Sequence, residues 1–144
     1  MTTQDNKYHV ALIARDYPSR ARLAVALVNE GFHVDLADDG IAAMPLIIEE
    51  RPDLVLIDSD IARVNGYGVC SITCSNRLVG HAPVVMFTEG EGIFDHAWAR
   101  VMGASHSLTN PVDPAELIEI MLELLTRPAA AHDPEIDAQV VGLD

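Results

Sequence analysis

Residues 52–66 have the sequence Pro-Asp-Leu-Val-Leu-Ile-Asp-Ser-Asp-Ile-Ala-Arg-Val-Asn-Gly. Within this segment Leu54 to Ile57 form an unbroken apolar run, which predicts a strand buried on both faces, as in a parallel sheet covered by helices. The run ends at a carboxylate, Asp58, and a loop then leads to Asn65-Gly66 and a helix. Ligands of open α/β sheets bind outside the carboxyl ends of the strands. Asp58 is therefore the first candidate functional residue.

Short apolar runs alternate with helical patterns along the chain, and together they predict five strand–helix pairs. In addition to the run that ends at Asp58, strands are expected at residues 8–14, 34–37, 83–87 and 105–108. Helices are expected at residues 18–30, 41–50, 67–77, 93–102 and 114–126. Right-handed crossovers between consecutive strands make all five strands parallel and place helices on both faces of the sheet.

The composition is that of one acidic domain. A chain of 144 residues is long enough for a single domain with a sizeable core. Its 9 Lys+Arg against 22 Asp+Glu give a formal net charge of −13, which argues against direct binding to nucleic acid or to an anionic membrane. The N-terminus has no signal-peptide pattern, and no apolar run reaches membrane-spanning length, so a cytoplasmic protein is expected.

The parts of the chain outside the strand–helix pairs are short. Residues 1–7 are expected to be an N-terminal extension, residues 8–126 the folded domain, and residues 127–144 an acidic, disordered tail.

Cys70 and Cys74 lie one helical turn apart, which is a poor placement for a disulfide, and two thiols alone do not make a zinc site. The six histidines never pair at the short spacing of a metal site, so structural or surface roles are expected for them.

Polar residues at the predicted strand ends resemble those of the response-regulator receiver domain of the chemotaxis (CheY-like) type. They are Asp16, Asp58, Asn65-Gly66, Thr88 and Asn110-Pro111, and the resemblance runs from about Tyr8 to Thr126. It implies a flavodoxin-like α/β fold with a five-stranded parallel sheet of order 2-1-3-4-5, and a role in two-component, phosphorelay or chemosensory signalling rather than in enzymatic catalysis. A finer resemblance, to receivers of type IV pilus (twitching-motility, PilG-like) systems, rests on Gly66-Tyr67, Cys70, Ser75-Asn76-Arg77, residues 92–95 and residues 99–103.

The resemblance also implies a role for each of these residues. Asp58 would accept a phosphoryl group from a histidine kinase. Asp16, Asp58 and the backbone carbonyl of Asp60 would hold Mg²⁺, a cation that prefers oxygen ligands. Thr88 and Asn110 stand at the positions that contact the phosphoryl oxygens in the family.

Two departures from the family's pattern affect charge at the site. Arg15 replaces one acid of a pair and places a permanent cation where Mg²⁺ would bind, so weaker metal binding is expected. Its guanidinium can instead pair with Asp58 or Asp16. Asn110 replaces the family's phosphate-binding lysine, and a neutral amide makes weaker hydrogen bonds to phosphate than a charged amine does.

Two further departures from the family's pattern affect the room for a phosphoryl group and the residue that signals its presence. Glu89 stands where a small residue is usual and would crowd and repel an incoming phosphoryl group, and Ser107 replaces the usual aromatic switch residue. The expected function is therefore an atypical receiver that acts by protein–protein contact, with weak or absent phosphorylation. Two alternatives stay open: a functional receiver phosphorylated on Asp58 with Mg²⁺, and a small flavodoxin-like enzyme or cofactor binder.

A weakened phosphosite would leave signalling to a binding surface. The helix expected at residues 114–126 has an apolar arc of roughly 200°, which is wider than packing on one face of a sheet requires. The excess apolar surface of this helix, together with a tryptophan of the preceding helix, forms a candidate interface for a partner. The residues of this candidate interface are Trp98, Ile118, Ile120 and Leu122. The expected partners are a histidine kinase, a chemosensory or pilus signalling protein, or a second copy of the chain. Alternatively, neighbouring helices or the apolar end of the tail cover the arc.

Overall fold

The computed structural model describes residues 8–61, 63–75, 82–90 and 93–127. Its strands form one parallel sheet in the order β2-β1-β3-β4-β5, which confirms the topology expected from the sequence. The strands are β1 (His9–Ile13), β2 (His33–Ala37), β3 (Leu54–Asp58), β4 (Val84–Thr88) and β5 (His106–Thr109). The helices are α1 (Pro18–Asn29), α2 (Gly40–Glu50), α3 (Gly66–Ser75), α4 (Ile93–Val101) and α5 (Pro114–Leu125). Every predicted element is present among the described residues, and apart from the C-terminal end of α3, which borders residues outside the description, the ends differ from the prediction by at most two residues.

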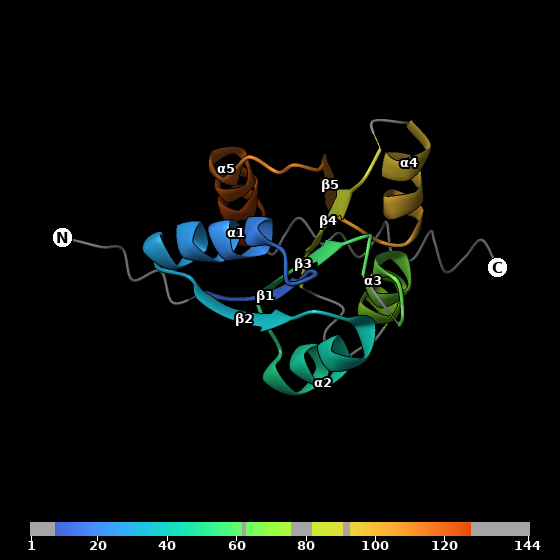
Figure 1. The fold of residues 1–144 in the computed structure, drawn as a ribbon, viewed down its shortest axis with the longest axis horizontal. Helices are drawn as coiled ribbons and strands as arrows, with labels where there is room; N and C mark the ends of the chain where they lie inside the picture. The colour runs from blue at the N-terminus through green and yellow to red at the C-terminus, as the bar shows by residue number, and fades with distance from the viewer. Residues whose placement is uncertain (1–7, 62, 76–81, 91–92, 128–144) are drawn as a thin grey trace.

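The helices cover both faces of the sheet in two layers. One face carries α1 and α5, and the opposite face carries α2 and α3, as Figure 1 shows. Helix α4 follows β4, and its buried Ala99 belongs to the same core cluster as residues of α2 and α3. This division agrees with right-handed crossovers in a doubly wound sheet.

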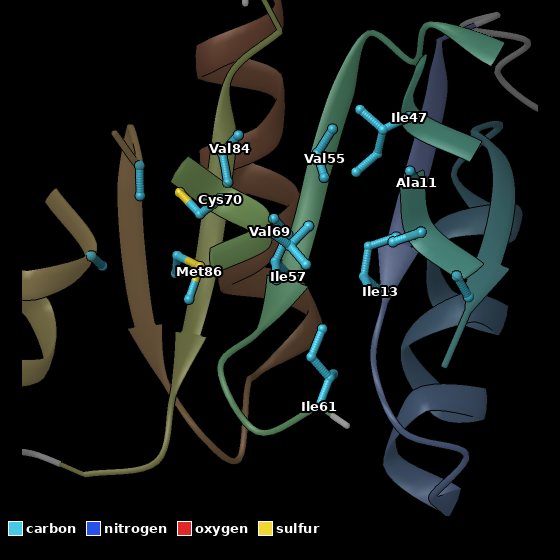
Figure 2. Packing of buried hydrophobic residues seen from close by; sticks show 14 residues of the cluster. Ala11, Ile13, Ile47, Val55, Ile57, Ile61, Val69, Cys70, Val84 and Met86 are labelled. Atoms are coloured by element: carbon cyan, nitrogen blue, oxygen red, sulfur yellow. The ribbon is translucent and has the colours of Figure 1, made fainter. Parts of the chain in front are cut away.

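The side chains of the central strands alternate between the two helical layers. On β1, Ala11 and Ile13 join the core cluster under α2, α3 and α4, whereas Val10 and Leu12 join the cluster under α1 and α5. All four residues of β3 from Leu54 to Ile57 are 0% exposed, which confirms the prediction of a strand buried on both faces. Figure 2 shows the first of these clusters, where side chains of β1, β3 and β4 pack against those of α2 and α3.

Gly66 begins α3 directly against the end of β3. A Cβ on this residue would lie 2.2 Å from the carbonyl oxygen of Asp58, so no larger residue fits without a backbone shift. The side-chain oxygen of Asn65 accepts a hydrogen bond from the backbone N–H of Gly68 at 2.9 Å, as a helix-capping residue does. Asn65 and Gly66 together hold the β3–α3 loop against the carboxyl end of β3.

Several expectations concern residues at the margins of the described chain. The boundaries of the N-terminal extension and of the tail stay predictions, because residues 1–7 and 128–144 lie outside the described residues, as do residues 76 and 77 of the predicted third helix. Within the described ranges, no helix has the length and apolar character needed to cross a membrane. Cys70 and Cys74 are free thiols, as expected, and Cys70 is buried.

Candidate functional site

A cavity of about 400 Å³ opens at the carboxyl edge of the sheet. The loops that follow β1, β3, β4 and β5 converge there because parallel strands all end at the same edge. The lining of the cavity includes Arg15, Asp58, Asp60, Glu89 and Asn110, so these five residues singled out from the sequence are brought together.

Asp58 is the last residue of β3 and lies partly buried in this cavity. The backbone N–H of Asp60 donates to its Oδ1 at 3.0 Å. Burial is the main cause that raises the pKa of Asp58 from 3.8 to about 6, and the carboxylates of Glu89 and Asp60 raise it further. The hydrogen bonds from the Asp60 N–H and from the Asn110 amide limit the rise, because they stabilise the ionised form.

Asn110 lies between two carboxylates and is held more closely by one of them. Its Nδ2 donates to Oε2 of Glu89 at 2.7 Å, but it lies 3.4 and 3.5 Å from the two carboxylate oxygens of Asp58. The first distance is that of a good hydrogen bond, and the other two are at the outer limit. Glu89, which the sequence suggested would crowd the site, therefore also holds the side chain of Asn110 by a hydrogen bond.

Arg15 bonds to neither of the carboxylates expected for it. One terminal nitrogen lies 3.7 Å from Oδ1 of Asp60, and the other donates to the hydroxyl of Tyr17 at 3.0 Å. The guanidinium carbon lies 6.0 Å from the centre of the Tyr17 ring, within the range of a cation–π contact. The expected pairing with Asp58 or Asp16 is replaced by a pairing with Asp60, a choice that depends on the side-chain rotamer.

Asp16 points away from the cavity. Its side chain is 80% exposed, and its Oδ1 accepts a hydrogen bond from a terminal nitrogen of Arg20, one helical turn further on, at 2.9 Å. The other terminal nitrogen of Arg20 donates to the carbonyl oxygen of Ala14 at 3.1 Å. These contacts hold Asp16 over the start of α1, and it is not among the residues that line the cavity.

The hydroxyl of Thr88 is directed to the backbone. The residue is fully buried and does not line the cavity, and its Oγ1 lies 3.4 Å from the carbonyl oxygens of both Leu108 and Gly90. A contact between Thr88 and a phosphoryl group would therefore require this hydroxyl to reorient.

Ser107 contacts a histidine that the sequence analysis did not single out. Nδ1 of His96, on α4, lies 2.5 Å from Oγ of Ser107, and Nε2 of the same ring lies 3.0 Å from Oγ1 of Thr109. Ser107 and Thr109 are two residues apart on β5 and so share one face of the strand. The sequence contained only a weak sign of this contact, namely a histidine in one helix and two hydroxyl residues two positions apart in the following strand. This pattern is too common to predict a contact between His96 and these hydroxyls.

The residues that the resemblance implies as Mg²⁺ ligands do not all face the cavity in this structure. No group of three or more His, Cys, Asp or Glu residues capable of holding a metal ion occurs in the described ranges. Of the three ligands implied by the resemblance, Asp58 and Asp60 lie together, but Asp16 is turned to Arg20. A terminal nitrogen of the Arg15 guanidinium lies 3.7 Å from Oδ1 of Asp60.

The fold and the residues of this cavity define a known class of signalling domain. Residues 10–122 match the response regulator receiver domain family, and the chain belongs to that family. Receiver domains act in two-component and chemosensory signalling, where they interact with histidine kinases and other signalling proteins, and they are not classical enzymes. The resemblance inferred from the strand-end residues is thereby confirmed.

Individual relatives agree with the family assignment. The chain is similar to the protein PilG of Pseudomonas aeruginosa, with 29% identity over 118 residues that cover 82% of this chain and 87% of PilG. It is also similar to the DNA-binding dual master transcriptional regulator RpaA of Synechocystis, with 32% identity over 87% of this chain but only 54% of RpaA. The chain thus spans about half the length of RpaA, and the match to PilG supports the finer resemblance to PilG-like receivers.

Solved structures show the same fold. A putative response regulator from Chloroflexus aurantiacus matches with a TM-score of 0.80 at 24% identity, covering 85% of this chain and all of that one (100%). The receiver domain of the sensor histidine kinase PA1611 from Pseudomonas aeruginosa matches with a TM-score of 0.76 at 21% identity, covering 83% of this chain and 98% of that one. The latter structure holds a magnesium ion in its active-site cleft.

Proposed function

We propose that this receiver signals by protein–protein contact, with weak or absent phosphorylation of Asp58, in a chemosensory system of the type IV pilus kind. The observation that carries the proposal is the position of the Asn110 amide, which bonds to Glu89 at 2.7 Å and lies at least 3.4 Å from Asp58. A phosphoryl group on Asp58 would meet the carboxylates of Glu89 and Asp60 without a lysine to offset its charge.

The orientation of Asp16 and Arg15 supports the same proposal. An aspartyl phosphate places dense negative charge beside other carboxylates and relies on a divalent cation to offset it. Here Asp16 is turned to Arg20, and Arg15 is engaged by Asp60 and Tyr17. Neither residue therefore offers Mg²⁺ a ligand beside Asp58.

The direct test is the intact mass of the purified protein after incubation with acetyl phosphate or phosphoramidate and Mg²⁺. The wild type and Asp58→Asn are treated together, with a competent receiver as the positive control. We expect no phosphoryl adduct on either protein, or only a small fraction on the wild type. A wild type that is largely phosphorylated, beside an unmodified Asp58→Asn variant, would overturn the proposal.

The alternative within the same family is a phosphoacceptor that reacts slowly. It is favoured by the geometry of Asp58 itself, which lines the cavity and forms no ion pair with any arginine of the described residues. Its carboxylate is therefore free to attack a phosphoryl donor that enters from solvent. The rate of adduct formation in the same experiment separates the two functions.

A second part of the proposal concerns the surface that contacts the partner. Helix α4 exposes a stripe of apolar side chains in which Phe94 is 85% and Trp98 is 51% exposed, with Val101 one turn further along. Of the three candidate interface residues on α5, only Leu122 is exposed, at 37%, because Ile118 and Ile120 are partly buried against the core cluster under α1 and α5. We therefore centre the proposed interface, for a partner or for a second copy of the chain, on α4.

The sequence analysis recognised Trp98 but missed the rest of the α4 stripe. Phe94, Trp98 and Val101 follow the i, i+4, i+7 spacing of one helical face, which was visible in the sequence. The same spacing also fits a helix whose apolar face packs on the sheet, and exposure distinguishes the two cases. Ala99 is the residue of α4 that is buried against the sheet.

A further inference from the structure

The two cysteines of the chain, Cys70 and Cys74, are neighbours on one face of α3. Residues four positions apart in a helix have Cβ atoms about 5–6 Å apart. Hydrogen bonding between the two thiols lowers the pKa of Cys74 and raises that of Cys70, and burial raises the pKa of Cys70 further. The sulfurs are therefore close enough to act as a pair.

The spacing of this pair suits a bridging ion better than a direct bond. A disulfide requires Cβ atoms about 3.5–4.5 Å apart, so it would draw two turns of α3 together. Metal–thiolate bonds are about 2.3 Å long for zinc, and an ion held in line between two thiolates separates their sulfurs by roughly twice that length. An ion between Cys70 and Cys74 therefore fits the spacing of the helix.

Backbone carbonyl groups of the turn after α4 face both sulfurs. Sγ of Cys74 lies 3.3 Å from the carbonyl oxygen of Gly103, and Sγ of Cys70 lies 3.7 Å from that of Met102. The turn comes so close that a Cβ on Gly103 would lie 2.7 Å from Sγ of Cys74. The negative ends of two carbonyl dipoles thus lie beside the thiols, which favours a cation there over an anion.

The number and burial of the ligands limit which cation fits. Cys70 is 0% exposed and belongs to the core cluster drawn in Figure 2, together with Met86, whereas Cys74 is half-buried and gives access from the surface. Structural zinc takes four ligands, and within the described ranges no third His, Cys, Asp or Glu joins the pair. Magnesium and calcium take oxygen ligands. Thiolates select Cu(I), a soft ion that two of them satisfy in a linear arrangement.

We propose that Cys70 and Cys74 form a binding site for one Cu(I) ion, held in line between their two thiolates. Two thiol protons pass to solvent as the two sulfur–metal bonds form, and no electron is transferred. The ion would stiffen the last turns of α3 and the turn at Met102 and Gly103 that packs on them, and so would give this receiver an input separate from Asp58. The inference does not depend on whether Asp58 is phosphorylated.

The test is a competition for Cu(I) between the full chain and a chromogenic Cu(I) chelator, under anaerobic conditions and with the thiols reduced beforehand. We expect the wild type to take one Cu(I) ion per chain from the chelator, a stoichiometry that native mass spectrometry checks. Cys74→Ser is expected to lower the affinity at least about a hundredfold, since it removes one of the two ligands. Asp58→Asn is expected to bind Cu(I) as the wild type does.

The matched control keeps two thiols but changes their spacing. In the double variant Cys74→Ser, Ile72→Cys the second thiol stands two positions from Cys70, at a residue of α3 whose side chain is 45% exposed. This variant should bind Cu(I) as weakly as Cys74→Ser alone, because residues two apart in a helix do not face each other. Far-UV circular dichroism checks that each variant keeps its helices.

Three results would overturn the inference. The first is that the wild type and Cys74→Ser bind Cu(I) equally. The second is that the variant with altered spacing binds Cu(I) as tightly as the wild type, since any two thiols would then suffice. The third is that Zn²⁺ at equal concentration displaces Cu(I) from the wild type, which would show that the pair does not select a soft, two-coordinate ion.

Discussion

The protonation of Asp58 connects the chemistry of the site to the stability of the fold. Its carboxyl group has an ordinary pKa of 3.8 that the folded protein raises to about 6, chiefly through burial. The folded state therefore holds this proton more tightly than the unfolded chain does, and the carboxyl of Asp58 reduces stability as the pH rises from about 4 through 6. At neutral pH the residue is ionised at a cost in folding free energy, as is common at functional sites.

Replacing this carboxylate by an amide should stabilise the protein at neutral pH. We expect Asp58→Asn to raise the free energy of unfolding by on the order of 1 kcal/mol at about pH 7.5, a figure reduced from the pKa shift to allow for solvent screening. The gain should be smaller at about pH 5, where the wild-type carboxyl is mostly protonated in the folded state. Urea denaturation at both pH values measures the difference. The control is Asp38→Asn, which changes an exposed carboxylate in the loop between β2 and α2. A gain of equal size for this control would show that general charge repulsion is responsible instead.

Under the proposed function, three residues at the site oppose phosphorylation, and reversing them should restore it. We expect the triple variant Arg15→Asp, Glu89→Ala, Asn110→Lys to form the acetyl-phosphate adduct roughly tenfold faster than the wild type, because it regains an acid for Mg²⁺ and a charged donor for the phosphoryl oxygens. Intact-mass time courses measure the rate. The same triple variant with Asp58→Asn is the control and should stay unmodified. No gain in the triple variant would mean that the orientation of Asp16 or Thr88, rather than these three side chains, limits the reaction.

At the scale of elements, His96 connects α4 to β5. Both of its ring nitrogens contact hydroxyls of β5, those of Ser107 and Thr109. A neutral imidazole donates from one nitrogen and accepts at the other, and a hydroxyl can take either part, so both contacts are satisfied together. This receiver therefore has a polar link between the helix and the strand.

Removing this link should loosen α4 without disturbing the sheet. We expect His96→Ala to lower the free energy of unfolding by about 1–2 kcal/mol, the usual range for losing two partly buried hydrogen bonds. Amide hydrogen exchange should quicken in α4 and β5 while β1 and β3 stay protected. The control is His106→Ala, an exposed histidine on β5, which should change neither quantity. Equal effects of the two variants would argue against a specific link.

At the scale of the whole molecule, the exposed apolar stripe on α4 should mediate association. We expect the double variant Phe94→Ser, Trp98→Ser to weaken self-association, or binding to the signalling partner, roughly tenfold or more, since exposed aromatic residues commonly dominate interfaces. Sedimentation velocity over a range of concentrations measures self-association. Val25→Ser, Val28→Ser is the matched control, because it removes two similarly exposed apolar residues from α1. A monomeric wild type, together with unimpaired signalling by the α4 variant in cells, would contradict the proposed surface.

The sequence by itself determined the five strands, their parallel direction and the place of Asp58 at a strand end, and the order of the strands followed from the resemblance to the receiver family. The unbroken run from Leu54 to Ile57 and the five alternating strand–helix pairs indicate a parallel sheet, because hydrophobic periodicity and right-handed crossovers act locally along the chain. The strand-end positions of Asp58 and Asn110 follow from that arrangement, and both residues line the cavity.

Only the tertiary structure decided how the polar side chains pair. Glu89 and Asn110 are 21 residues apart, and His96 lies 11 residues from Ser107, yet each pair is in hydrogen-bond contact. Arg15 had several carboxylates within reach, and its rotamer selected Asp60. These partners come from loops that meet only at the edge of the folded sheet, where small rotations exchange one acceptor for another, so no pattern along the chain specifies them.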